Sequence, residues 1–312
     1  MVDEANIAPL VSGMIIAREA SSEDAPEISE VYRSDYPNPA LFDRIPDEPE
    51  YYYPLGGQWM HESTCREHIE RFKNMGGIIL VAELNGRIVG EIELMLEDDP
   101  PPYGRYLYIY TLMVHRQYRG RGIGSRLVRE AERYARGLGV DNIMVVAEDR
   151  SRGFYEKLGF ELFDVWATVR IEPERSDIEA SFDRVDGLYL AERLLREKYR
   201  PVLGKFGGNR SLLYDLTCSF SSLRKLRIEH IFLRTYVDER ETILALRRSS
   251  NIPNIVCCWC DERISVHTAI SIAKNAAYML GIGQPITCVQ KKHHRDVGLT
   301  LIGDNPWYAR RP

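Results

Sequence analysis

Residues 118–127 read "YRGRGIGSRL", with three glycines and three arginines in ten positions. They follow a run of strand-forming residues, "YLYIYTLMV", and overlap "SRLVREAERYARGLG", whose apolar residues share one helical face. A glycine loop between a strand and a helix leaves unpaired backbone N–H groups at the helix N-terminus, where the helix dipole adds about half a positive charge. The stretch therefore predicts a loop that binds phosphate groups.

Three types of phosphate-binding loop can be compared with this stretch. A dinucleotide-binding G-x-G-x-x-G loop would need Gly or Ala where Ser125 stands, and the strands before it do not form a βαβ opening. A P-loop would need a lysine after its last glycine, and the stretch has none. The pattern [RQ]-x-x-G-x-[GA] is matched by Arg119, Gly122 and Gly124. The third type thus remains, and its support must come from the rest of the chain.

The segments around the loop predict a β-α-α-β-β-β-α-β-α-β order of elements. Asn85-Gly86 marks the turn of a hairpin, and residues 34–61 hold five prolines without a regular period, which predicts a long loop. The elements are expected at residues 14–18, 21–32, 62–75, 77–96 (the hairpin), 105–114, 125–139, 141–148, 150–160 and 161–171.

Two motifs and this order of elements carry a resemblance to a known family. The first motif is "LMVHRQYRGRGIGSRLV" at 112–128, and the second is "FYEKLGF" at 154–160, with one helix and one strand between them. Together they make residues 12–170 resemble the GNAT superfamily of acyl-CoA-dependent N-acetyltransferases. The resemblance implies an α/β (α+β) fold with a mixed central sheet flanked by helices. It also implies acetyl-CoA as the co-substrate and no metal.

The resemblance implies roles for individual residues. Backbone amides of the strand end would pair with the pantetheine arm and polarise the thioester carbonyl; this end is Leu112, Met113 and Val114. The pyrophosphate would lie on the loop formed by Arg119, Gly120, Arg121, Gly122, Ile123, Gly124 and Ser125. Tyr155 would protonate the CoA thiolate, since a hydroxyl with a pKa of about 10 keeps its proton at neutral pH. Packing beside Phe154 and Phe160 is the alternative role for Tyr155.

The general base is the point at which the sequence departs from the family. Many relatives carry a carboxylate on the central strand, where this chain has Tyr110 and Thr111. Glu91 and Glu93 on the neighbouring strand are the candidate bases, acting directly or through water, and Glu148 is a third. The alternative for Glu91 and Glu93 is an ordinary solvated strand face.

Residues 34–61 occupy the region that covers the acceptor site in this family. Their aromatic and acidic side chains suit a cationic amine, through cation–π contacts and charge attraction. A surface lid without acceptor contact is the alternative. The predicted acceptor is a primary amine, on a small molecule or on a protein. His115, at the loop entrance, is expected to be a solvated histidine.

Charge divides the chain into two unlike halves. Residues 1–180 carry 20 Lys+Arg and 33 Asp+Glu, whereas residues 181–312 carry 21 and 13. Such a division is typical of halves that attract each other, within one chain or between the two chains of a homodimer. The predicted parts are an acetyltransferase-like domain at 1–170, a linker at 171–187 and a smaller α/β domain at 188–312.

The second part predicts a β-α-β-α-β-β order after an initial helix at 188–200, with "ERETILALRRS" at 239–249 as a helix. This order echoes the first unit, so a degenerate acetyltransferase-like half is one interpretation. No glycine loop follows the corresponding strand, and CoA binding is not expected there. Cys257-x-x-Cys260 resembles a redox or zinc motif, but buried strand packing is the preferred interpretation.

The remaining composition narrows the class of protein. No run of about 20 apolar residues and no basic leader segment is present, so a cytoplasmic protein without a membrane partner is expected. No recognition helix or aromatic ladder accompanies the basic residues 291–295, so nucleic acid is not an expected partner. The predicted function is acetyl transfer from acetyl-CoA to an amine. A non-catalytic acyl-CoA sensor with a C-terminal interaction domain is the alternative.

Overall fold

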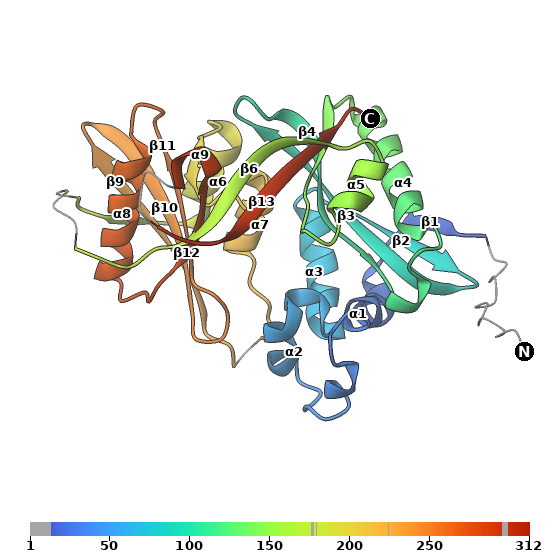
Figure 1. Ribbon diagram of the computed structural model, residues 1–312. Coiled ribbons are helices and arrows are strands. Elements are labelled where there is room, and N and C mark those ends of the chain that lie inside the picture. The colour runs from blue at the N-terminus through green and yellow to red at the C-terminus, as the bar shows by residue number, and fades with distance from the viewer. Residues whose placement is uncertain (1–13, 176–177, 179, 224, 295–298) are drawn as a thin grey trace, which may run out of the picture.

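One continuous sheet organises the molecule. The computed structural model describes residues 14–175, 178, 180–223, 225–294 and 299–312. Their strands form one sheet, and helices cover both of its faces (Figure 1). The strands are mixed, with antiparallel pairs and two parallel pairs, β4–β5 and β11–β12. The predicted mixed α/β class is confirmed.

The first half contains the expected order of elements with one added helix. Its strands and helices are β1 (Ile16–Glu19), α1 (Ala25–Arg33), α2 (Pro49–Gly56), α3 (Glu62–Asn74), β2 (Ile78–Leu84), β3 (Arg87–Asp99), β4 (Gly104–Val114), α4 (Ile123–Leu138), β5 (Asn142–Val146), α5 (Arg152–Lys157) and β6 (Glu161–Arg170). The added helix, α2, lies within the segment predicted as a loop. Pro49 begins it, at the helix position where the missing N–H of proline costs nothing.

The second half repeats much of this order. Its elements are β7 (Asp183–Val185), α6 (Gly187–Ala191), a π-helical turn (Glu192–Arg196), β8 (Pro201–Leu203), α7 (Asn209–Thr217), β9 (Ile228–Val237), β10 (Arg240–Ser249), β11 (Ile255–Cys260), α8 (Val266–Met279), β12 (Ile286–Gln290), α9 (Lys291–His294) and β13 (Thr300–Arg310). Thus β2–β3–β4–α4–β5–α5–β6 in the first half corresponds to β9–β10–β11–α8–β12–α9–β13 in the second.

The last strand of each half is inserted into the sheet of the other half. The strand order is β1-β2-β3-β4-β5-β13-β6-β12-β11-β10-β9-β7, so β13 lies between β5 and β6, while β6 lies between β13 and β12. Figure 1 shows β6 and β13 side by side across the middle of the molecule. The order is symmetric about this pair. The two halves therefore share one sheet.

Two segments differ from the sequence-based expectation. Residues 240–249 form strand β10 rather than a helix, because "ILAL" is buried on both faces of the sheet and gives no period to distinguish the two structures. The hairpin turn before it has no glycine: Asp238 and Glu239 themselves adopt positive φ, of 49° and 63°. Within the predicted linker, residues 183–185 form β7 and pair with β9.

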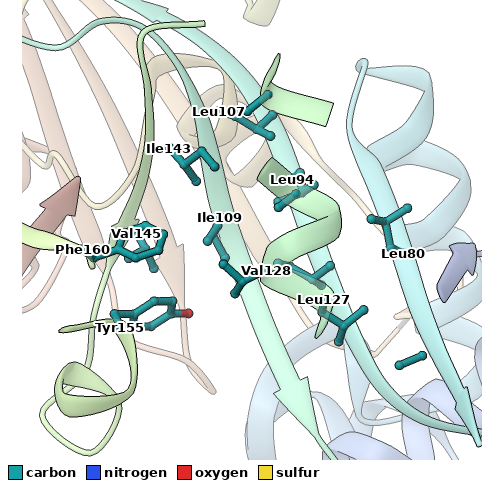
Figure 2. Close-up of a cluster of buried hydrophobic side chains, with 14 of the residues drawn as sticks. Leu80, Leu94, Leu107, Ile109, Leu127, Val128, Ile143, Val145, Tyr155 and Phe160 are labelled. Atoms are coloured by element: carbon teal, nitrogen blue, oxygen red, sulfur yellow. The ribbon is translucent and has the colours of Figure 1, made fainter. Parts of the chain in front are cut away.

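The core of the first half lies between the sheet and α4. Strand residues Leu80, Leu94 and Ile109 pack against Leu127 and Val128 of the helix, as Figure 2 shows. Each of these side chains is buried, which contributes about 2 kcal/mol per residue. The predicted apolar face of this helix is thus the packed one. No helix among the described residues is long and apolar enough to cross a membrane.

Two carboxylates of β3 hold the second half against the first. Glu97 accepts hydrogen bonds from the backbone N–H groups of Arg210 (2.7 Å) and Ser211 (2.8 Å), at the N-terminus of α7. Asp99 accepts from the backbone N–H of Asn209 (3.0 Å) and forms a buried ion pair with Lys205 (2.7 Å). These contacts give acceptors to the first amides of α7, which have no partner within the helix. They fix α7 beside β3 and β4.

Candidate active site

A cleft opens where β4 and β5 separate. The two strands pair from Tyr106–Asn142 to Ile109–Val145 and no further. A bulge places Tyr110 as an extra residue in β4, because Glu93 of β3 pairs with Thr111 and the next residue, Leu94, pairs with Ile109. The resulting cleft has a volume of about 750 Å³ and is lined by β4, β5, α5 and the glycine loop.

The glycine loop ends at the N-terminus of α4. Gly120 and Gly122 have φ of +77° and +80°, a conformation that other residues adopt only with strain. The first intrahelical bond runs from Arg126 N–H to Gly122 C=O (2.9 Å). The amides of the preceding turn, residues 123–125, therefore have no partner within the helix. This end of the cleft is built to accept an anion.

Most of the residues predicted to bind the donor lie along the cleft. Those whose atoms line it are Leu112, Met113, Val114, Arg119, Gly120, Gly122, Gly124 and Ser125. Two do not. Arg121 lies over the Tyr118 ring, 5.3 Å from its centre, and Ile123 is a core residue 1% exposed. Arg121 is exposed to solvent, whereas Ile123 packs in the core under α4.

An acidic residue bridges the mouth of the cleft. Asp35 pairs with Arg119 of the glycine loop (2.7 Å) and with Arg150 of the loop after β5 (2.9 Å). Arg119 also donates to the C=O of Val114 (3.1 Å). Although partial burial acts the other way, the two guanidinium groups hold the pKa of Asp35 below its usual value. The arginines are thus held in place on both sides of the opening.

Tyr155 is packed in the core and also reaches the cleft wall. It lines the cleft, yet it is only 5% exposed and packs against Phe154 and Phe160, with ring centres 5.1 and 5.4 Å away. Figure 2 shows its hydroxyl directed away from α5. Burial, with a smaller effect of Glu148, raises the pKa of Tyr155, so the hydroxyl stays protonated at neutral pH. Catalysis by this group stays a prediction.

Glu91 and Glu93 of β3 are fully buried, so the alternative of a solvated strand face is wrong for both. Oε1 of Glu93 accepts from Trp59 Nε1 (2.7 Å) and lies 2.8 Å from His68 Nε2. Helices α1 and α3 cover this face of the sheet. The alternation of residues along β3 could not show that helices bury it. Neither carboxylate lines the cleft.

Both groups of the Glu93–His68 contact are neutral at pH 7. Burial raises the pKa of Glu93 to about 8 and lowers the pKa of His68 to about 4. The contact is therefore a hydrogen bond between uncharged groups rather than an ion pair. Burial, followed by the neighbouring carboxyl of Glu93, raises the pKa of Glu91 as well.

Two hydroxyl groups lie between the cleft and Glu91, whose two carboxylate oxygens are buried without a hydrogen-bond partner. Thr111 lines the cleft, and its Oγ1 lies 3.1 Å from the hydroxyl of Tyr32. The carboxylate of Glu91 is close enough to Tyr32 to raise the pKa of that hydroxyl, after the larger effect of burial. A base role for either glutamate stays a prediction, and it requires such a relay. Glu148 lines the cleft directly, but its carboxylate pairs with Arg150 (2.8 Å).

The second half contributes a residue that the sequence did not indicate. The Tyr110 hydroxyl, on the bulged residue of β4, donates a hydrogen bond to Oδ1 of Asp215 on α7. Burial raises the pKa of Asp215 to about 6. No local motif surrounds Asp215. The placement of α7 by Glu97 and Asp99 brings this carboxylate to Tyr110, which lines the cleft.

The segment 34–61 packs on the first half instead of lying open. Tyr32 stacks on Trp59 with ring centres 5.1 Å apart, and Phe42 stacks on Tyr52 at 5.4 Å. These rings are part of the cluster under α1 and α3. His115 is 8% exposed, so the expected solvated histidine is wrong. Its Nδ1 accepts from Gln117 N–H, which caps the turn before the loop.

In the second half, β11 and β12 correspond to β4 and β5, and the space between these two strands is filled by β8 and the residues after it. Strand β8 pairs with β11, and Gly204 N–H donates to Cys288 C=O on β12 (2.8 Å). A Cβ on Gly204 would lie 2.4 Å from Cys257 Sγ, so only glycine fits. Cys257 and Cys260 are buried within β11. The described residues contain no group of three or more side chains suited to a metal ion.

Comparisons with known proteins agree with this geometry. Residues 26–160 match the model of the acetyltransferase (GNAT) family. The chain is 31% identical to human N-acetyltransferase 8B over 102 residues, which are 30% of this chain and 45% of that protein. It is 36% identical to glucosamine 6-phosphate N-acetyltransferase of Trypanosoma brucei brucei over 76 residues, 24% of this chain and 52% of that one. The chain therefore spans about half the length of these curated relatives.

Solved structures resemble the whole chain at low identity. A tandem GNAT protein from the clavulanic acid biosynthesis pathway aligns with a TM-score of 0.56 and 14% identity, over 96% of this chain and 98% of that one. A GCN5-related N-acetyltransferase from Anabaena variabilis aligns with a TM-score of 0.60 and 12% identity, over 96% and 73%. Both likenesses concern the fold.

Proposed function

Residues 26–160 are a domain of the GNAT acetyltransferase family, and on that premise we propose that the protein transfers an acetyl group from acetyl-CoA to a primary amine. The observation that carries the proposal is the cleft between β4 and β5. It has an anion-binding helix N-terminus at one end and a buried, protonated tyrosine in its wall.

The donor would lie along β4. Beyond Ile109 this strand has lost its partner β5, so its backbone groups on that side are open to the amides of a pantetheine arm, in the manner of an added strand. The pyrophosphate would accept hydrogen bonds from the amides of residues 123–125 and pair with Arg119.

The reaction would proceed by direct attack in a ternary complex. The amine nitrogen forms a bond to the thioester carbon, the carbon–sulfur bond breaks, and Tyr155 donates its proton to the departing thiolate. The proton of the amine passes to a carboxylate. The candidates are Glu91, beside Tyr32 and Thr111, and Glu93 next to it. Each accepts the proton only when ionised, and burial shifts that ionisation toward higher pH. A tyrosine is suited to the acid role because it remains protonated until a strong base forms beside it.

A thiol-release assay with acetyl-CoA and a panel of primary amines tests this function. The expected result is release of CoA that depends on the amine and yields the N-acetyl product in equal amount. The panel should include free amino acids, diamines, amino sugars and a peptide with a free N-terminus. Tight acetyl-CoA binding without turnover of any amine would instead support the non-catalytic sensor.

A further inference from the structure

A second pocket, of about 230 Å³, lies on the other side of Tyr110 from the acyl cleft. Both halves of the chain build it. Tyr53 of α2 and Gln58 come from the first half, and Asp215 of α7, His230 of β9 and Arg247 of β10 come from the second. Tyr53 and Phe220 close one side, with ring centres 5.9 Å apart.

Two opposite charges face this pocket without neutralising each other. Asp215 and Arg247 both line it, and no ion pair within 4 Å joins them among the described residues, although Arg247 lowers the pKa of Asp215. Arg247 donates to the C=O of Pro253 (3.0 Å), while its Nε is buried without a hydrogen-bond partner. Nε2 of His230 is likewise buried and unpartnered. Burial lowers the pKa of His230 to about 4, so this ring is neutral and can donate one hydrogen bond.

Arg247 and His230 both line the pocket, so a ligand there can meet a guanidinium group and an imidazole ring on one side and the Asp215 carboxylate on the other. Arg247 and His230 offer donors suited to a carboxylate, whereas the Asp215 carboxylate suits an ammonium group. Phe220, Leu223 and Ile228 add an apolar wall. A diamine would place a second positive charge against the Arg247 guanidinium, which disfavours it.

Asp215 lies at the end of the pocket nearer the acyl cleft, whereas Arg247 and His230, which would bind the carboxylate of a ligand, lie at the other end. Tyr110 lines the acyl cleft, and its hydroxyl bonds to Asp215. Tyr108 lies two residues before Tyr110 on β4. Its pKa is raised by burial, then by Asp215, Glu97 and Tyr155. The Asp215 carboxylate and Tyr155 therefore flank the same stretch of β4. An ammonium group on Asp215 would lie beside the end of the cleft where the thioester is expected.

We propose that this second pocket is the acceptor site, and that it takes a small zwitterion of the α-amino acid type with an apolar side chain. The ammonium group pairs with Asp215, and the carboxylate pairs with Arg247 and His230. This inference rests on the acetyl transfer proposed above and adds the class of acceptor. The volume suits a free amino acid and leaves no room for a folded protein segment.

Paired substrates test the carboxylate contact. Leucine, methionine and phenylalanine are each compared with their carboxamides, which keep the ammonium group and side chain but lack the negative charge. The expected kcat/KM for acetylation is about 10- to 100-fold higher for the amino acid than for its carboxamide. Arg247→Gln should abolish this preference, and Arg247→Lys should retain part of it. Asp215→Asn should lower kcat/KM for both members of each pair.

Arg248→Gln is the matched control. Arg248 is the next residue of β10, is exposed, and pairs with Glu229 outside the pocket (3.0 Å from Nε). This variant should keep the preference for amino acids. Melting temperatures show whether each variant is folded.

Leucine binding by calorimetry, without acetyl-CoA, separates the two proposals. Acetylation of amines without any preference for the carboxylate, unchanged in Arg247→Gln, would overturn the acceptor inference and leave acetyl transfer standing. Leucine binding that requires Arg247, without acetylation of any amine, would support the pocket and overturn acetyl transfer. Absence of both binding and acetylation would overturn both.

Discussion

The hydroxyl of Tyr110 donates a hydrogen bond to the carboxylate of Asp215, and this bond joins the strand that lines the acyl cleft to a helix of the second half. Tyr110 is the bulged residue of β4, and Asp215 is held in place by the capping of α7 from β3. The strand that lines the cleft and the pocket proposed for the acceptor thus share one contact, made by a residue of the second half.

The first prediction concerns the pH dependence of activity in Tyr110→Phe. Burial raises the pKa of Asp215 to about 6, and the Tyr110 hydrogen bond lowers it by stabilising the carboxylate. Without this bond, the pKa of Asp215 rises further, and the ionised form needed to hold an ammonium group appears only at higher pH. We expect the acidic limb of kcat/KM to move upward by about one pH unit. An unmoved limb, or an equal shift in the remote control Tyr134→Phe, would argue against this role.

Gly208→Ala is expected to weaken the contact between β3 and the N-terminus of α7, which joins the two halves. A Cβ at this position would lie 2.2 Å from Cδ of Glu97, whose carboxylate caps α7. Displacing that carboxylate leaves buried amides unpaired, and we expect a loss of about 2–3 kcal/mol in the free energy of unfolding. Gly137→Ala in α4 is the control: nothing lies within 4 Å, and alanine favours a helix by about 1 kcal/mol. Chemical denaturation measures both. Equal stability of the two variants would contradict the assignment.

Much of the donor site could be predicted from the sequence because its signals are local. The glycine loop and the helix after it follow from residues within one strand–loop–helix unit, and Tyr155 was identified through the family resemblance of a second short motif, at 154–160. Long-range contacts set the rest. The exchange of β6 and β13, the burial of Glu91 and Glu93 under α1 and α3, and the contact of Asp215 with β4 depend on segments far apart in the chain. Strand β10 was missed because burial on both faces removes the period that identifies a strand.

Asp35→Asn is expected to strengthen donor binding. Asp35 presents a carboxylate to Arg119 and Arg150 at the cleft mouth, where the phosphates would compete for the same guanidinium groups. Both arginines are partly exposed, so each pair is worth at most about 1 kcal/mol. We expect the Kd for acetyl-CoA to fall about two- to fivefold at low salt, with a smaller effect at high salt. Asp43→Asn, an exposed residue of the same segment, makes the same change in net charge. Calorimetric titration would contradict the assignment if both variants bound equally.

Glu93→Gln is expected to change the pH dependence of stability. The amide mimics the protonated carboxyl that the folded protein prefers, since burial raises the pKa of Glu93 from 4.5 to about 8. Between these values the unfolded chain releases a proton that the folded chain keeps, so the wild type loses up to about 1.4 kcal/mol per pH unit relative to the variant as pH rises. Below pH 4.5 the difference should be constant. Denaturation at pH 4, 5, 6, 7 and 8 measures it, and a difference that stays flat throughout would show that Glu93 ionises normally.

The central claim is that the cleft binds acetyl-CoA and that Tyr155 protonates the departing thiolate. Its most direct test is to measure kcat and the Kd for acetyl-CoA together in Tyr155→Phe, which keeps the buried ring and removes only the hydroxyl. We expect kcat to fall about 10²- to 10⁴-fold while the Kd for acetyl-CoA stays within about threefold of the wild-type value. An unchanged kcat, or a Kd that rises as much as kcat falls, would contradict it.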